Sequence, residues 1–294
     1  MKKLVWIVAL LMTFVFESEA QEARARTEKI HVKVGGPNSE EAATLADWGI
    51  TKIPKYRALI IGVSEYQHAS AGLRNLAEPV NDAQKLYDVL TTHYTFEPND
   101  VIFLKNPTRG QIVDSLELLA QKVKPDENLL VFYAGHGIFD KKLDIGYWIP
   151  SDGVEGRKST FLANSELRNY LKGITSKHTL LISDACFGGS IFSAGRSSYE
   201  ANEMGKFNDI YKVRSRKALT SGNYQEVPDK SIFMEYLIKT LSENVKAYIA
   251  ATLLYTKIYE PIQNNSRVLP QYGAIQDAGD EGVSGSFIFI RKAN

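Results

Sequence analysis

Cysteine is almost absent from this sequence, since Cys186 stands alone among 294 residues. No disulfide can form within the chain, so the fold must rest on its buried core alone. An excess of charge is lacking too, because 35 Lys and Arg residues balance 34 Asp and Glu residues. We therefore expect no nucleic-acid partner and no strong attraction to an acidic membrane surface.

Metal-ligand spacing is also missing. The single cysteine and five histidines are scattered along the chain and form none of the closely spaced pairs that zinc sites use. No internal repeat is visible. The overall composition, with 44% hydrophobic and 23% charged residues, is that of a globular protein with enough chain for one large domain or two small ones.

The N-terminus departs from this composition. A short basic start (MKK) precedes an apolar run over residues 4–16, which has the length of a secretory signal and is too short for a comfortable membrane span. Small residues stand at positions 18 and 20. We predict a signal peptide over residues 1–20 and an exported, periplasmic or secreted product, with an uncleaved anchor or a buried helix as the alternatives.

The rest of the chain divides into a linker or pro-segment over residues 21–55 and a domain over residues 56–294. Within the domain, continuous apolar runs are typical of strands that are buried on both faces of a sheet. These runs cover residues 57–63, 100–105, 128–135, 178–184, 216–221 and 286–291.

Helical patterns alternate with these runs. Pro79 suits the first position of a helix, and Thr108 and Gln111 have capping-box spacing. Further helices are expected near 164–172, 231–243 and 251–260. The alternation predicts an α/β fold with a mostly parallel central sheet of about six strands flanked by helices. The polar, aperiodic stretch at 190–215 is predicted to be an exposed loop between a larger and a smaller part.

Two motifs follow neighbouring apolar runs. His136 lies between two glycines just after one run, and Cys186 lies two residues after Asp184, the last residue of another. The carboxyl ends of parallel strands meet at one edge of a sheet, where sites form. An imidazole beside a thiol makes the thiol a good nucleophile, and flanking glycines such as Gly137 let backbone amides approach a developing oxyanion. Taken singly, a surface histidine and an inert buried cysteine are the alternative readings.

The pair YAGHG and DACFGG resembles the histidine and cysteine motifs of caspase-like cysteine peptidases, especially metacaspases and bacterial orthocaspases. The spacing also agrees, because the histidine of this family lies about 50 residues upstream of the cysteine. Residues 57–66, 76–90, 216–223 and 271–291 resemble other parts of the same family. The resemblance implies a three-layer caspase-like fold and peptide-bond hydrolysis by a dyad of Cys186 and His136, with an oxyanion hole made by the amides of Gly137 and Cys186.

Asp184 stands where caspases have glutamine. Residues i and i+2 of an extended segment point the same way, so Asp184 should face the same side as Cys186. Metacaspases resemble this sequence in pairing such an acid with one at the start of the first helix, here Asp82. Two carboxylates would bind a P1 Arg or Lys. The alternatives are a helix-start carboxylate at Asp82 and a structural strand-end acid at Asp184.

The resemblance raises further expectations. Some relatives cleave themselves at basic residues, and the candidates here are Arg196, Lys212, Arg214 and Arg216. A monomer is expected rather than a dimer, with a peptide or protein as substrate and no membrane partner after signal cleavage. No cofactor is expected to be required. Calcium stays open as an activator, although the acids near His136 show no calcium-ligand spacing; they are Asp126, Glu127, Asp140 and Asp144.

Two other classes of function compete with peptide hydrolysis. One is a catalytically silent caspase-like binding or scaffold module, but such proteins usually lose the cysteine or the histidine, and this chain keeps both. The other is a different thiol enzyme, such as an acyltransferase. The acidic pair argues against an acyltransferase only if Asp82 and Asp184 converge.

Overall fold

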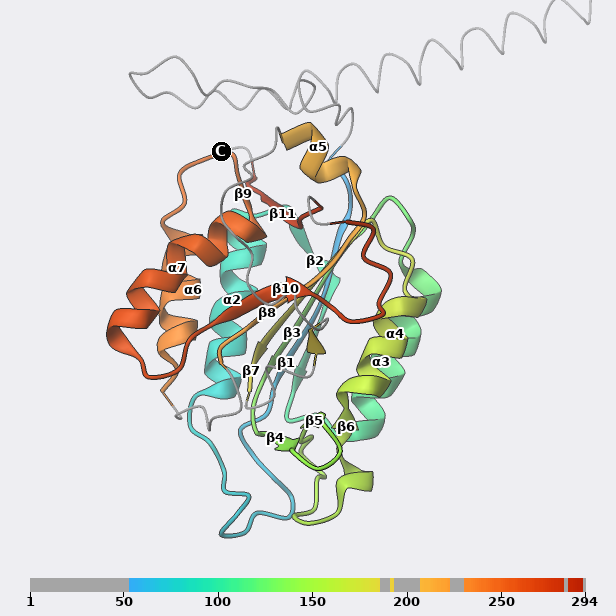
Figure 1. The fold of residues 1–294 in the computed structure, drawn as a ribbon, viewed down its shortest axis with the longest axis vertical. Helices are drawn as coiled ribbons and strands as arrows, with labels where there is room; N and C mark the ends of the chain where they lie inside the picture. Colours follow the sequence, from blue (N-terminus) through green and yellow to red (C-terminus); the bar gives the residue numbers. More distant parts are fainter. Residues whose placement is uncertain (1–52, 186–190, 193–206, 223–229, 283–284, 293–294) are drawn as a thin grey trace, which may run out of the picture. The chain divides into compact units, whose positions relative to one another are not determined.

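The architecture is an α/β sandwich built on a six-stranded sheet (Figure 1). The computed structural model describes residues 53–185, 191–192, 207–222, 230–282 and 285–292, and Pro54–Lys292 form one compact unit. The strand order is β10-β8-β7-β3-β1-β2. The strands are β1 (Tyr56–Gly62), β2 (Phe96–Lys105), β3 (Asn128–Ala134), β7 (His178–Asp184), β8 (Ser215–Thr220) and β10 (Gln271–Ala274).

Five of these strands run parallel and β10 runs antiparallel to β8. Every residue of β3, β7 and β8 is buried, as expected for a parallel sheet that is covered on both faces. The predicted fold class is therefore confirmed. Five of the six apolar runs form parallel strands of this sheet, with boundaries within a few residues of those predicted.

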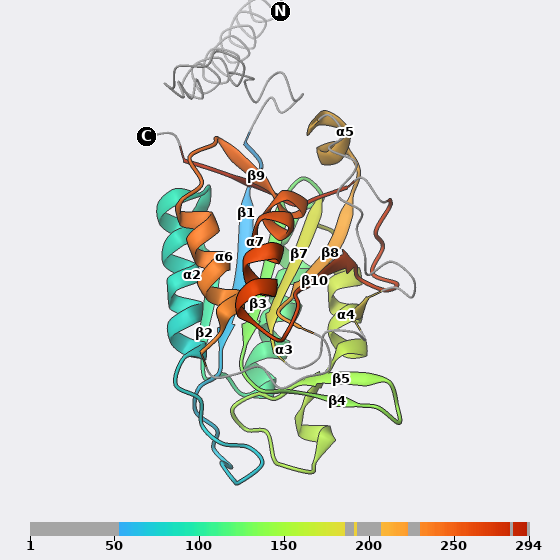
Figure 2. The ribbon, with the colours of Figure 1, turned by 60° about the vertical axis from the view of Figure 1, so that its left-hand side comes forward.

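Helices cover both faces of the sheet. In Figures 1 and 2, α2, α6 and α7 lie on one face, and α3 and α4 lie on the other. The Thr108–Gln111 capping box is present at the start of α3, Pro79 opens α2, and the Ser231 hydroxyl caps α6. The bounds are α2 (Pro79–His93), α3 (Arg109–Lys122), α4 (Asn164–Gly173), α6 (Ile232–Ser242) and α7 (Ala251–Asn265). None of the helices in the described part of the chain is long and apolar enough to cross a bilayer.

The last apolar run does not join the central sheet. Residues Ile288–Ile290 form β11, which pairs antiparallel with β9 (Tyr248–Ala250) in a separate two-stranded sheet. The sixth central strand is instead β10, whose sequence QYGA carries too short an apolar signal to be recognised. A third sheet, formed by β4 (Gly137–Asp140), β5 (Ile145–Trp148) and β6 (Leu162–Ala163), was also not predicted.

The stretch 190–215 is not simply an exposed loop. Ile191 and Phe192 are buried, and Phe192 forms an isolated bridge to Ile275. Residues Phe207–Lys212 form the short helix α5. Residues 193–206 lie outside the described part of the chain.

Arg216 is wrong as a cleavage candidate. It lies in β8 and is fully buried. Its Nη1 donates to the Ser215 carbonyl, and its Nη2 donates to the carbonyls of Ile174 and Ser176, each at 2.9 Å. Ile174 is the C-cap of α4, so the guanidinium neutralises the negative end of that helix. A residue held in this way anchors the fold and offers no bond to a peptidase.

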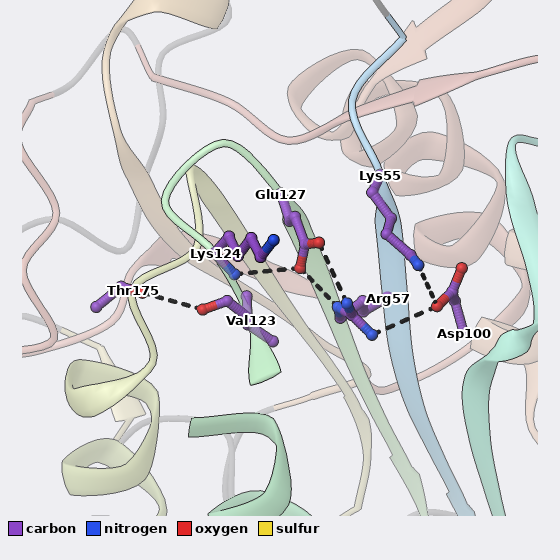
Figure 3. Close-up of polar contacts among 7 residues, drawn as sticks. All are labelled: Lys55, Arg57, Asp100, Val123, Lys124, Glu127 and Thr175. Carbon is purple, nitrogen blue, oxygen red and sulfur yellow. Dashed lines mark hydrogen bonds and ion pairs between the residues drawn. The ribbon is translucent and has the colours of Figure 1, made fainter. Parts of the chain in front are cut away.

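A charged network joins three strands near the amino ends of β1 and β3 (Figure 3). Arg57 Nε donates to Glu127 Oε2 at 2.6 Å and its Nη1 donates to Asp100 Oδ1 at 3.3 Å, while Lys55 Nζ lies 2.8 Å from the same Asp100 oxygen. Burial works to raise the pKa of Glu127, but hydrogen bonds from Arg57 and the Lys124 amide outweigh it and lower that pKa. Glu127 is thus committed to structure at the sheet edge opposite His136.

We predict that Arg216→Met lowers the free energy of unfolding by about 3 kcal/mol, because it leaves the buried carbonyls of Ile174 and Ser176 without a donor. Urea unfolding followed by circular dichroism measures the change. Arg157→Met is the matched control, since Arg157 is exposed and should shift stability by less than about 0.5 kcal/mol. Equal effects of the two substitutions would contradict the anchoring role.

Candidate active site

The alignment of β3 with β7 defines the candidate site. The two strands pair in register from Asn128↔His178 to Ala134↔Asp184, and the Gly135 amide extends the pairing to the Asp184 carbonyl at 3.4 Å. His136 follows the end of β3 by two residues, and Cys186 follows the end of β7 by two residues. Cys186 itself lies outside the described residues, together with 187–190.

The main chain of His136 is held on both sides by tyrosine hydroxyls. The His136 amide donates to Tyr66 Oη at 2.8 Å. The Tyr133 hydroxyl lies 2.7 Å from the His136 carbonyl and 2.9 Å from that of Ile149, and can donate to either. The Ile149 amide also donates to the His136 carbonyl at 3.0 Å. The backbone of this partly buried histidine is therefore fixed where β3 gives way to β4.

A hydrogen bond fixes the tautomer of the His136 ring. Its Nε2 lies 2.8 Å from the main-chain carbonyl oxygen of Arg74. Because a carbonyl can only accept, Nε2 must carry the proton, and in the neutral ring Nδ1 is then the basic nitrogen. This arrangement suits a general base that acts through Nδ1.

Sequence reasoning found no third residue to orient His136, and the structure shows the Arg74 carbonyl beside its Nε2. Every residue except the last has a peptide carbonyl, so the side chain at position 74 carries no signal for this role. Only the path of the segment between β1 and α2 brings this oxygen to the imidazole.

Gly135 has a more specific role than the sequence suggested. Its φ is +155°, and a Cβ built there would lie 2.9 Å from Tyr133 Oη and 3.1 Å from Tyr66 Oη. The glycine is thus required by the two hydroxyls that hold His136. Gly137 is the first residue of β4 and pairs with Trp148.

Two carboxylates lie at the same edge of the sheet. Asp184 ends β7 and Asp82 lies in the first turn of α2, and both are buried. Burial raises the pKa of Asp184 to about 6, the hydroxyls of Ser221 and Ser231 partly offset the rise, and the charge of Asp82 adds to it. The two acids are therefore close enough to repel each other. Asp82 also accepts a hydrogen bond from Lys85 Nζ at 2.9 Å.

One oxygen of Asp184, Oδ1, is buried and has no hydrogen-bond partner among the residues that the structure describes. The hydroxyls of Ser221 and Ser231 interact with the same carboxyl and lower its pKa, and the Ser221 amide donates to the Ser183 carbonyl at 3.0 Å. Unpaired acceptors are costly inside a protein, so this group is suited to a ligand that brings its own donors. Sequence reasoning did not find these hydroxyls, because serine is common at the ends of strands and helices.

The remaining acids do not gather into a metal site. Asp140 accepts from Lys158 and from two amides of its own turn, and Glu127 belongs to the Arg57 network. Among the residues that the structure describes, no group of three or more His, Cys, Asp or Glu is placed to hold a metal ion.

The other cleavage candidates also have engaged carbonyls. Lys212 is exposed at the end of α5, and its carbonyl accepts from Lys177 Nζ at 2.6 Å. The Arg214 carbonyl accepts from the Glu281 amide at 3.2 Å. Arg196 lies outside the described residues.

Comparison with known families decides where the protein belongs. A family model described as a caspase domain matches residues 55–272, which covers most of the chain, including both motifs, five of the central strands and the first half of β10. The chain belongs to the caspase-domain family of cysteine peptidases.

Several relatives of this caspase domain are metacaspases. It is 30% identical over 96 residues to metacaspase-1 of Candida glabrata, a match that covers 30% of this chain and 24% of the relative. It is 29% identical over 112 residues to metacaspase-1 of Eremothecium gossypii, covering 35% and 23%. The matches thus span about a quarter of the length of these relatives.

Solved structures agree with the fold. Caspase-1 from Spodoptera frugiperda superposes with a TM-score of 0.54 at 16% identity, covering 76% of this chain and 87% of that one. A protein from Geobacter sulfurreducens gives 0.52 at 15% identity, covering 76% and 94%. At these identities the likeness concerns the fold alone.

The buried Asp184 should weaken the fold as the pH rises. A raised pKa means that the folded state holds the proton more tightly than the unfolded chain, so stability falls as the pH climbs from about 4 through about 6. We predict that Asp184→Asn lacks this loss. Between pH 4 and pH 8 the free energy of unfolding of wild type should therefore fall by about 3 kcal/mol more than that of Asp184→Asn. Urea unfolding of both proteins at each pH tests this; parallel pH profiles would contradict it.

Proposed function

We propose that this caspase-domain protein is a cysteine endopeptidase that cleaves after Arg or Lys. The observation that carries the proposal is the pair of buried carboxylates, Asp82 and Asp184, at the sheet edge where His136 emerges. A cation that enters this group would relieve the repulsion between the two acids. It would also supply a donor to the unpaired Oδ1 of Asp184.

The proposed reaction uses Cys186 as nucleophile. His136 Nδ1 takes the thiol proton, and the sulfur attacks the carbonyl carbon of the P1 residue. The amides of Gly137 and Cys186 would stabilise the oxyanion. As the C–N bond breaks, His136 returns the proton to the leaving amine. Water, activated by the same imidazole, then hydrolyses the thioester and restores the thiol.

Asp184 makes this recognition dependent on pH. The carboxylate must be ionised to pair with a P1 cation, and burial favours its protonated form. A bound guanidinium or ammonium favours ionisation in turn. The specificity for basic residues should therefore weaken below about pH 6, in addition to any effect on the Cys186–His136 pair.

A catalytically silent binding module is the rival function. The oriented tautomer of His136, fixed through the Arg74 carbonyl at 2.8 Å, favours an enzyme, because a binding module needs no basic Nδ1. The closeness of Asp82 and Asp184 favours a peptidase for basic P1 residues over an acyltransferase.

Peptide substrates that differ only at P1 test the proposal directly. We expect wild type to hydrolyse Arg- and Lys-P1 peptides and to leave the Asp-P1 peptide intact. Cys186→Ala should abolish the activity, and Asp184→Asn should lower kcat/KM for basic P1 residues by roughly 100-fold or more, because it removes a buried charge pair with the substrate. Cleavage after Asp, or activity that survives Cys186→Ala, would refute the assignment. The same assay with calcium and with a chelator tests calcium as an activator.

We also propose that the enzyme processes itself in the stretch between β7 and β8. Arg216 is excluded by its burial, while Lys212 and Arg214 would first have to release the Lys177 and Glu281 hydrogen bonds on their carbonyls. Arg196 lies outside the described residues and stays a candidate from the sequence alone. The proposed product is exported after signal cleavage following residue 20 and acts as a monomer.

Intact-mass spectrometry of purified wild type and Cys186→Ala, under denaturing conditions, tests self-processing. We expect wild type to yield two fragments, cut after a basic residue of this stretch, and the Cys186→Ala protein to remain whole. The mass of the Cys186→Ala protein, expressed with residues 1–20 present, also shows whether the signal peptide has been removed. An intact wild-type chain under assay conditions would contradict self-processing.

A further inference from the structure

Tyr66 lies in the segment between β1 and α2 and makes two contacts with His136. Its hydroxyl accepts the hydrogen bond of the His136 amide at 2.8 Å. Its ring lies against the imidazole, with the ring centres 5.0 Å apart and the planes inclined by 48°. The side chain is buried, with 4% of its surface exposed, so it forms a fixed wall behind the catalytic ring.

The position of Tyr66 is itself determined by its neighbours. Its amide donates to Asn75 Oδ1 at 2.8 Å, and its hydroxyl reaches the Val63 carbonyl at 3.3 Å. Asn75 directly follows Arg74, whose carbonyl lies beside His136 Nε2. The segment that holds the Tyr66 main chain is therefore also the segment that presents the oxygen to the imidazole.

The Tyr66 hydroxyl lies in a tightly packed place next to the Tyr133 hydroxyl. Together with the Tyr133 hydroxyl it fills the space where a side chain of residue 135 would lie. Burial raises the pKa of Tyr66 well above its usual range, so the phenol stays protonated. It can then donate to Val63 while it accepts from His136, at any pH where the enzyme works.

We propose that Tyr66 is a positioning residue for His136. The hydroxyl fixes the histidine backbone and the ring limits its rotation, so that Nε2 stays on the Arg74 carbonyl and Nδ1 stays directed away from it. The inference rests on the proposed function, since it assumes that His136 is the base for Cys186. A small displacement of a catalytic group is costly, with a shift of about 1 Å worth up to roughly 100-fold in rate.

Tyr66→Phe tests this proposal, because it keeps the ring and removes the acceptor of the His136 amide. With an Arg-P1 peptide, we expect kcat to fall by roughly 10- to 100-fold, with KM changed by less than about twofold, since Tyr66 touches the base and not the substrate. Alkylation of Cys186 by iodoacetamide gives a readout without substrate. Its pH midpoint should move to higher pH, because a displaced imidazole stabilises the thiolate less.

Controls separate positioning from a general effect on the fold. Tyr87→Phe removes a hydroxyl from a partly buried ring that stacks on Phe103 in α2 and β2, and it should leave kcat and the alkylation midpoint unchanged. A Tyr66→Phe protein that is less stable but has the wild-type kcat and alkylation midpoint would overturn the proposal. If Tyr66→Phe does not fold, Asn75→Ser replaces it, because this change weakens the hydrogen bond to the Tyr66 amide. Asn75→Ser should also lower kcat and raise the pH midpoint of alkylation, and wild-type values of both would overturn the proposal.

His136→Ala distinguishes this failure from failure of the proposed function. If that variant keeps full activity, His136 is not the base, and the proposed mechanism falls together with the inference. If His136→Ala is inactive and Tyr66→Phe is unaffected, the mechanism stands and only the positioning role of Tyr66 is lost.

Discussion

The in-register pairing of β3 with β7 is the constraint on which the site depends. Two strands that are fifty positions apart in the chain end at the same level, at Ala134 and Asp184. Each is followed two residues later by a chemically active side chain. Because a parallel sheet that is buried on both faces tolerates no slip of register, the apolar interior of the domain determines where the site forms. The geometry of the candidate site is therefore set by buried apolar residues that take no part in it.

Hydrogen bonds restrain both the main chain and the ring of His136. Its amide, its carbonyl and its Nε2 each have a partner, and Gly135 leaves room for the hydroxyls involved. By contrast, the acidic group nearby has a carboxyl of raised pKa, one oxygen of which lacks a partner among the described residues. The histidine is therefore well satisfied by hydrogen bonds within the protein, while the acidic pair is not.

Much of this could be read from the sequence, because buried parallel strands leave long apolar runs and caps leave local spacing. The Thr108–Gln111 capping box and the strand that ends at Asp184 are examples. The strand β10 and the Arg74 carbonyl could not be read, since one is four residues long and the other is a backbone atom without a side-chain signal. Arg216 was misjudged for a third reason. A basic residue at the end of a polar stretch resembles a surface residue, and only the tertiary contacts with the end of α4 reveal that it is buried.

The pairing of β7 with β8 has a practical consequence for anyone who isolates this protein. The strands share six residue pairs in the interior of the sheet, and Lys177 and Arg216 add bonds across the same junction. A chain broken between 193 and 206 would therefore keep both pieces in one particle. Such a nick would go unnoticed in gel filtration and would appear only on a denaturing gel.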